Sequence, residues 1–204
     1  MKNIKEACVE NFAEALAAQA AGADRIELCE NLVGGGTTPS YGTIKKCMEK
    51  LNIPVFVMIR PRGGNFVYSE DEISIMKEDI LLCKQFGVQG VVFGLLTKDD
   101  KVDEKNTSEL IGLARPMQVT FHKAFDELND MNEALETLIR LGVNRILTSG
   151  TRETALEGAV VLNPLIELSK GRITIVAAGR ITKDNLSDLS RLIGTTEFHG
   201  RKIV

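Results

Sequence analysis

Three segments of the sequence nearly repeat one another, and they limit the folds open to the chain. They read AGADRIELC, FGVQGVVFG and LGVNRILTSG, and they end at Cys29, Gly94 and Gly150. In each segment a glycine precedes a short run of β-forming residues, as expected where a helix ends and a buried strand begins. The repeated unit is a helix followed by a strand, which predicts an α/β fold with a mostly parallel sheet.

The sequence between these repeats predicts eight strands with amphipathic helices between them. Apolar residues recur at helical spacing in segments such as Phe12–Ala21, Glu70–Phe86, Met131–Leu141 and Leu186–Ile193. The expected strands are Ile4–Cys8, Arg25–Cys29, Pro54–Arg60, Gly90–Gly94, Gln118–His122, Arg145–Ser149, Thr174–Ala178 and Glu197–His199. Eight such units predict a TIM-type (β/α)8 barrel, which would be short because barrels of this type use ~250 residues. Only five residues follow His199, so a full last helix is not expected. A doubly wound open sheet is the alternative.

The composition and charge of the chain limit the classes of function that it can have. With 204 residues, of which 44% are hydrophobic, residues 1–204 should form a single domain with a sizeable core. The net charge of −3, with both signs mixed along the chain, argues against a nucleic-acid partner. The sequence shows neither a secretion leader nor an apolar run long enough for a bilayer, which predicts a cytoplasmic protein with no membrane partner. Its four cysteines should then be reduced thiols.

Polar side chains gather where the expected strands end. In a barrel of this type the chemistry lies at the carboxyl ends of the strands. Alternation along each strand puts four pairs on the inward face, namely Glu6 with Cys8, Glu27 with Cys29, Thr120 with His122, and Glu197 with His199. Buried charge is costly unless it is paired, so this convergence predicts a polar cluster at the barrel mouth. An ion-pair network that only satisfies itself is the alternative reading.

One hypothesis makes this cluster an enzyme site with general acid/base chemistry. The catalytic candidates are Glu6, Glu27, His122, Glu197 and His199. His122, in the stretch VTFHKAFD, is the expected acid or base, because an imidazole with a pKa near ~6.5 exchanges protons near neutrality. A nearby carboxylate would orient its ring. Alternatively His122 is a core imidazole with a local hydrogen bond, to Asp126 for example.

The same hypothesis requires groups that hold a small anionic substrate, a carboxylate or a phosphate. Arg60 and Arg62 would clamp the anion, since guanidinium groups bind planar anions with two parallel hydrogen bonds. Ser149, in TSGTRETA, and the turn ENLVGGGTTPSYG could add hydroxyl and backbone N–H donors. The glycine-rich turn could equally be a flexible loop capped by Ser40.

Several long motifs in order resemble the copper homeostasis protein CutC family. They are ADRIELCENLVGGGTTPS, VFVMIRPRGGNFVYS, VTFHKAFD, RILTSGTRETALEG and TEFHG, and together they extend over essentially the entire chain. The resemblance implies a TIM-type barrel, a cytoplasmic location and a link to copper handling, with cysteines as Cu(I) ligands. The matching positions are Cys8 and Cys29. The chain departs from the family's pattern at AAGRIT, where a glycine-rich turn is usual, and at Lys123, where arginine is more common.

The last predictions concern metal binding by the cysteines and the oligomeric state. Soft thiolates select Cu(I), and Cys8 and Cys29 end neighbouring strands, although both could also be plain barrel filling. Cys47 and Cys83 fall in helical patterns and should be core residues. A barrel without its last helix would expose apolar strand surface, which predicts a homodimer or higher oligomer. The leading interpretation is a copper homeostasis protein that binds Cu(I), with the acid/base enzyme as the alternative.

Overall fold

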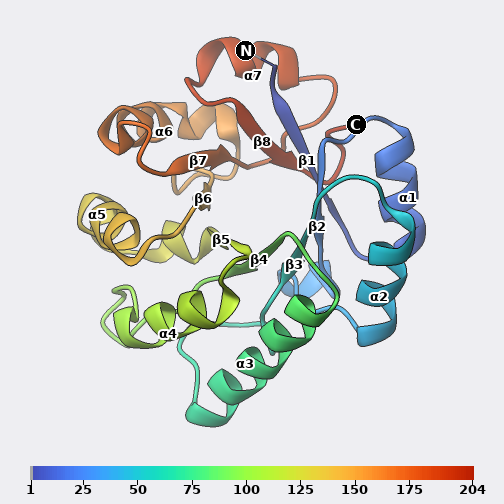
Figure 1. Cartoon of the computed structure of the whole chain (residues 1–204). Coiled ribbons are helices and arrows are strands. Elements are labelled where there is room, and N and C mark those ends of the chain that lie inside the picture. The colour runs from blue at the N-terminus through green and yellow to red at the C-terminus, as the bar shows by residue number, and fades with distance from the viewer. Residues whose placement is uncertain (1) are drawn as a thin grey trace.

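Eight parallel strands close into a barrel in a computed structural model that describes residues 2–204 (Figure 1). Each strand pairs with its sequence neighbours, and β8 pairs back onto β1. The strands are β1 Ile4–Val9, β2 Arg25–Leu28, β3 Val55–Met58, β4 Gly90–Phe93, β5 Gln118–Phe121, β6 Arg145–Thr148, β7 Thr174–Ala177 and β8 Glu197–Gly200. The predicted TIM-type barrel is therefore confirmed, and the doubly wound alternative is wrong.

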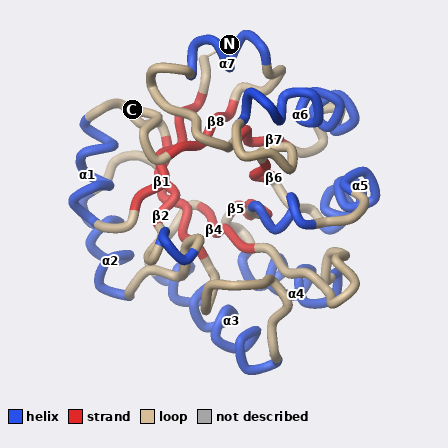
Figure 2. Tube along the Cα trace, turned by 180° about the vertical axis from the view of Figure 1, so that it is seen from behind, coloured by secondary structure: helices blue, strands red, loops and turns tan. Residues whose placement is uncertain are grey.

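Seven α-helices surround the strands (Figure 2). They are α1 Phe12–Ala20, α2 Tyr41–Lys50, α3 Glu70–Gln85, α4 Glu104–Ala114, α5 Met131–Leu141, α6 Ala155–Ser169 and α7 Leu186–Leu192. Two 3-10 helices, η1 Leu32–Gly34 and η2 Lys123–Glu127, lie in the loops after β2 and β5. Ser69 and Glu72 cap α3 reciprocally, and a left-handed glycine, Gly142, ends α5, which are the signals expected at helix ends. Within the described chain no helix follows β8, as the sequence predicts. None of the described helices is long and apolar enough to cross a membrane.

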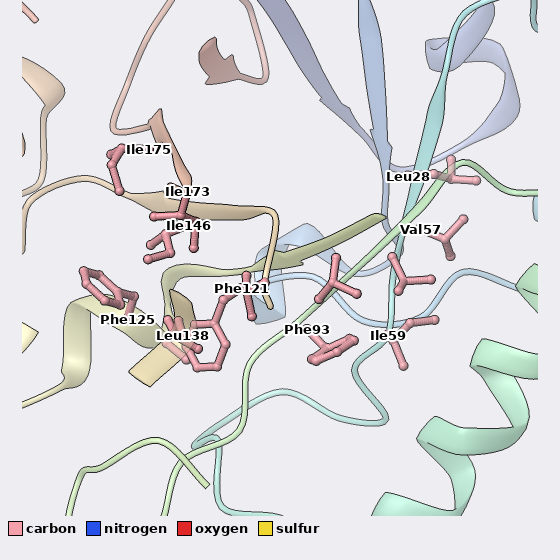
Figure 3. Close-up of a cluster of buried hydrophobic side chains, with 14 of the residues drawn as sticks. Leu28, Val57, Ile59, Phe93, Phe121, Phe125, Leu138, Ile146, Ile173 and Ile175 are labelled. Carbon is pink, nitrogen blue, oxygen red and sulfur yellow. The ribbon is translucent and has the colours of Figure 1, made fainter. Parts of the chain in front are cut away.

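The main hydrophobic core lies between the barrel wall and the helices. Figure 3 shows part of it, where Val57, Phe93 and Phe121 from three strands pack with their neighbours. Each such side chain contributes roughly 1.5–3 kcal/mol when it is removed from water. Two smaller apolar clusters fill the barrel interior, and one of them contains Cys8, Cys29 and Met58.

Strand register places the charged residues together in one sector of the interior. Glu6 lies opposite Arg25 on one side and His199 on the other, and Cys8 lies opposite Glu27. Because alternate residues of a strand share a face, Arg25, Glu27 and Cys29 all line the interior with this group. The sector formed by β8, β1 and β2 is thus rich in ionisable groups.

The surface beside β8 differs from the expectation of exposed apolar strand. Phe198, on the outward face of β8, is fully buried, and Ile203 from the last residues is buried as well. Lys202 pairs with Thr182, which holds this segment against the loop after β7. The physical reason given for a dimer is therefore wrong, whereas the oligomeric state itself stays a prediction.

Candidate functional site

A cavity of about 220 Å³ opens at the carboxyl ends of the strands. It is lined by Cys8, Glu27, Cys29, Leu32, Gly35, Met58, Phe66, His122, Lys123, Leu147, His199 and Arg201. A larger depression of about 1050 Å³ between α1 and the loops after β7 and β8 shares four of these residues, namely Cys8, Lys123, His199 and Arg201. The candidate site is therefore open to solvent on the β8 side.

His199 is the centre of the charged sector. Its Nδ1 lies 2.8 Å from Glu6 Oε1, and its Nε2 lies 3.7 Å from Glu27 Oε2. Burial alone would lower the pKa of His199, but the charge of Glu27 and hydrogen bonds to Cys8 and Glu6 outweigh it and raise the pKa well above its ordinary value. His199 is thus held as an imidazolium.

Glu6 anchors this imidazolium to the barrel floor. Arg25 donates from Nε to the second oxygen of Glu6. Burial would raise the pKa of Glu6, yet Arg25 and His199 together lower it to about 2. Glu6 is therefore a permanent carboxylate that orients both of its partners.

Cys8 lies beside His199 and Glu27. One ligand atom from each of the three residues lies within 4.8 Å of the others, which makes them a group that could hold a metal ion. A hydrogen bond from Cys29 and the neighbouring His199 lower the pKa of the Cys8 thiol well below its ordinary value, despite burial. Cys8 is thus a thiolate paired with the imidazolium.

The pKa of Cys29 is shifted in the opposite direction to that of Cys8. Its interaction with the Cys8 thiolate, then its burial, raise the pKa of Cys29 well above the ordinary value, and its Sγ lies 3.5 Å from Glu27 Oε2. Burial also raises the pKa of Glu27 well above normal. Cys8 and Cys29 therefore share the site as one thiolate and one thiol, with a further sulfur from Met58 in the same apolar cluster.

His122 contacts none of the expected carboxylates. Its Nδ1 accepts a hydrogen bond from the backbone N–H of Ala124 at 3.2 Å, and its ring lies 4.8 Å from that of Phe66. Burial, followed by the charge of Arg60, lowers the pKa of His122 to about 3. This lowered pKa does not favour proton exchange by His122 near neutrality, so a catalytic role for His122 stays a prediction. Its local hydrogen bond is to Ala124 rather than to Asp126.

The expected anion clamp is engaged by loop backbone. Arg60 donates to the carbonyl oxygens of Gly34, Gly36 and Gly64, and it stacks on Phe66. The glycine-rich turn thus presents carbonyl oxygens to Arg60, instead of N–H groups to an anion. Arg62 binds Glu72 at 2.6 Å and is not among the residues that line the cavity. The two guanidinium groups therefore hold loop segments in place in this structure.

Neither Ser149 nor Glu197 lines the cavity. The hydroxyl of Ser149 lies 3.0 Å from Asp126 Oδ2 and 2.7 Å from the carbonyl oxygen of Arg152. Glu197 begins β8, two residues before His199, so it lies ~6.6 Å lower in the barrel. It binds Arg25 at 2.6 Å and Arg145 at 3.0 Å, which places it at the opposite end of the barrel from His122.

Some site residues were missed by the sequence reasoning. Arg25 alternates with Glu27 and Cys29, so the alternation rule already places it on the inward face. Phe66 and Arg201 come from loops, and no periodicity marks loop side chains that fold over a barrel mouth. Lys123 directly follows His122, yet it reaches the rim only because η2 begins there.

Comparisons with known proteins agree on one family. The family model of the CutC family matches residues 3–204. A human copper homeostasis protein cutC homolog is 50% identical over 96% of this chain and 72% of its own length. A CutC family protein of Mesorhizobium japonicum is 47% identical over 95% of this chain and 75% of its own. The solved structure of a CutC protein from Streptococcus agalactiae superposes with a TM-score of 0.94 at 36% identity, over 99% of this chain and all of that one.

Proposed function

Because the chain belongs to the CutC family, we propose that it acts in copper homeostasis by binding Cu(I) at the barrel mouth. Its human and mouse relatives are described as copper homeostasis protein homologs. The single observation that carries the proposal is the position of Cys8 among other donor atoms, within 4.8 Å of both His199 and Glu27. Thiolate and imidazole ligands favour Cu(I) over the hard cations that prefer carboxylates.

Cys8 and Cys29 are the proposed metal ligands, with His199 as a third donor. Cys8 is already a thiolate, so it can bind the ion without first losing a proton. The pKa values of Cys29 and His199 are both raised, so each must release a proton when it binds the metal. Copper binding should therefore weaken as the pH falls.

The other two thiols are unsuited to this role. Cys47 lies in α2 and Cys83 in α3, and both are fully buried against the barrel wall. Burial raises the pKa of Cys47 to about 11 and that of Cys83 to about 12. Among the described residues, neither belongs to a group of side chains that could hold a metal ion.

A competition titration against a Cu(I) chelator, under reducing and anaerobic conditions, tests the proposal. The double variant Cys8→Ser/Cys29→Ser should lose tight binding. The matched control Cys47→Ala/Cys83→Ala removes two thiols from the helices and should keep the affinity of the wild type. Wild-type affinity in the first double variant would refute this site.

A second candidate function is acid/base catalysis on a small anionic substrate, with His199 in place of His122. The observation in its favour is the arrangement of His199, which Glu6 orients through Nδ1 while Nε2 faces Cys8 and Glu27. This matches a proton-exchanging group held by a carboxylate. Incubation with a panel of small organic acids and sugar phosphates, followed by proton NMR, should show consumption of one compound by the wild type and none by His199→Gln. No consumption of any of them would count against catalysis.

A further inference from the structure

Two of the residues that line the 220 Å³ cavity each carry a buried polar side-chain atom that has no hydrogen-bond partner within residues 2–204. These atoms are His122 Nε2 and Glu27 Oε1. Buried polar groups in folded proteins are nearly always paired, so unpaired ones on two residues of the same cavity need an explanation. We infer that the cavity binds a small hydroxycarboxylate, which receives a hydrogen bond from His122 and pairs its hydroxyl with Glu27.

The geometry of His122 makes its free nitrogen a donor. Nδ1 accepts from the Ala124 N–H, so in the neutral ring the proton must be on Nε2. The Nδ1 edge packs against Gly94, where an added Cβ would come within 2.5 Å of Nδ1. The opposite edge of the ring carries Nε2–H, and His122 is one of the residues that line the cavity. A ligand oxygen is the acceptor that this N–H lacks.

Glu27 provides a complementary group. Its Oε2 is engaged by Cys29 at 3.5 Å and by His199 at 3.7 Å, whereas Oε1 is free of partners in the described structure. A ligand hydroxyl can either donate to this oxygen or accept from it, so it fits both protonation states of the carboxyl. A hydroxyl is thus the simplest group to pair with Glu27.

The rim of the cavity favours a carboxylate on the same ligand. Lys123 and Arg201 both line it, and their side chains are 48% and 59% exposed. Lys123 lies 3.6 Å from Asp126, and Arg201 makes an exposed hydrogen bond of 3.3 Å to Glu10. Both cations can therefore turn toward an incoming anion with little loss.

The remaining walls set the size of the ligand. They are apolar and come from Leu32, Met58, Phe66 and Leu147. A volume of 220 Å³ equals that of roughly seven water molecules. A three-carbon hydroxy acid such as glycerate has a comparable number of non-hydrogen atoms.

This inference deepens the second candidate function, because it names the class of ligand that a catalytic mouth would take. Binding itself needs neither turnover nor copper. Copper-free protein, kept free of metal by a Cu(I) chelator, can therefore be tested directly and should bind glycerate. Failure of the copper proposal, absence of catalysis and failure of this inference are thus three separate results.

The chain has only two histidines, so NMR of protein labelled with 15N at histidine can follow His122 directly. Titration with glycerate should shift the His122 Nε2–H signal in a saturable way. Propionate lacks the hydroxyls and glyceramide lacks the charge, and each should bind about tenfold more weakly, because unmatched buried groups penalise an analogue. Equal affinity for all three compounds, or no shift of His122 with glycerate, would overturn the inference.

Substitutions of residues that line the cavity test whether glycerate binds there. His122→Phe keeps a ring against Phe66 but removes Nε2–H, and it should abolish saturable glycerate binding measured by calorimetry. The exposed pair Lys123→Ala/Arg201→Ala does not threaten the fold and should weaken glycerate by roughly threefold to fivefold per side chain. The matched control Lys98→Ala, which removes a lysine outside the cavity lining, should bind as the wild type does. Unchanged affinity in the rim variant would show that the rim cations contribute nothing and would overturn the carboxylate assignment.

Discussion

The two ends of the barrel interior are built from similar residues but differ in how completely these are paired. At the amino-terminal end, Glu6, Arg25, Arg145 and Glu197 bind one another, and none of their buried polar atoms lacks a partner in the part of the chain that is described. Phe56 packs against both guanidinium groups, whose central carbons lie 4.8 Å (Arg25) and 5.0 Å (Arg145) from its ring centre. At the mouth, His122 and Glu27 each keep an unpaired atom.

The difference assigns a separate role to each end. A fully paired ionic layer stabilises the fold only while it is complete, because each of its charges depends on the others. An incompletely paired layer is costly for stability, and such departures from good packing are expected where ligands bind. The amino-terminal end thus supports the structure, and the mouth is free to bind.

The largest effect should follow from breaking the paired layer at its centre. Arg25→Met removes the common partner of Glu6 and Glu197 and leaves both carboxylates inside the barrel. We expect the free energy of unfolding to fall by about 3–5 kcal/mol. Urea denaturation measures it. Arg140→Ala, which breaks an exposed ion pair with Glu104 at 2.8 Å, is the control and should cost less than ~1 kcal/mol. A similar cost for both arginines would show that the buried layer is not special.

The second-largest change in stability should come from Glu6, whose carboxylate contacts Arg25 on one side and His199 on the other. A pKa of about 2 for Glu6, against an ordinary 4.5, corresponds to ~3 kcal/mol of stabilisation at neutral pH. This contribution is present above pH 4.5 and is lost as the pH falls toward 2. Glu6→Gln should therefore destabilise the protein by about this amount at pH 7, with a much smaller difference near pH 2. A difference that does not depend on pH would contradict the ionic origin.

A smaller effect, of about 2 kcal/mol between pH 6.5 and pH 5 at ~1.4 kcal/mol per pH unit, should come from His122. Its folded pKa of about 3 lies below the ordinary 6.5, so between these values the unfolded chain takes up a proton that the folded chain does not. Its contribution to stability is therefore complete above pH 6.5 and is lost as the pH falls toward 3. Glu27, with its raised pKa, gives the opposite slope, so the informative quantity is the difference between wild type and His122→Phe. From pH 6.5 to 5 the unfolding free energy of the wild type should fall relative to that of His122→Phe, and parallel curves would contradict a buried neutral imidazole.

Much of this contrast could be predicted from sequence periodicity, and part of it could not. Alternation of side chains along a strand correctly puts Glu6 with Cys8, and Glu27 with Cys29, inside the barrel. It does not give the stagger between strands, which sets Cys8 level with Glu27 and Glu6 level with His199. Glu197 was for that reason assigned to the wrong end.

Loop conformation accounts for the other differences. Arg60 was expected to face an anion, but its guanidinium meets the carbonyl oxygens of a glycine-rich turn whose path no local pattern specifies. The two histidines look alike in sequence, and their opposite charge states depend on neighbours brought by other strands. Glu6 and Glu27 surround His199, whereas Phe66 and Arg60 shield His122.

The smallest expected change in stability is that of Glu27→Gln. Its sign is opposite to that of Glu6→Gln, so it distinguishes the two ends of the barrel most directly. Glu27 is as deeply buried as Glu6, but its cationic partner is His199 at 3.7 Å, whereas Arg25 donates a hydrogen bond directly to Glu6. Burial outweighs the effect of His199 and raises the pKa of Glu27. At neutral pH a neutral isostere avoids the cost of a buried charge, so Glu27→Gln should leave the stability unchanged or raise it by up to ~1 kcal/mol. Thermal and urea unfolding of Glu27→Gln and Glu6→Gln, side by side at pH 7, make the comparison. If Glu27→Gln destabilises as strongly as Glu6→Gln, then both glutamates belong to a single structural network and the mouth is not a separate, ligand-binding layer.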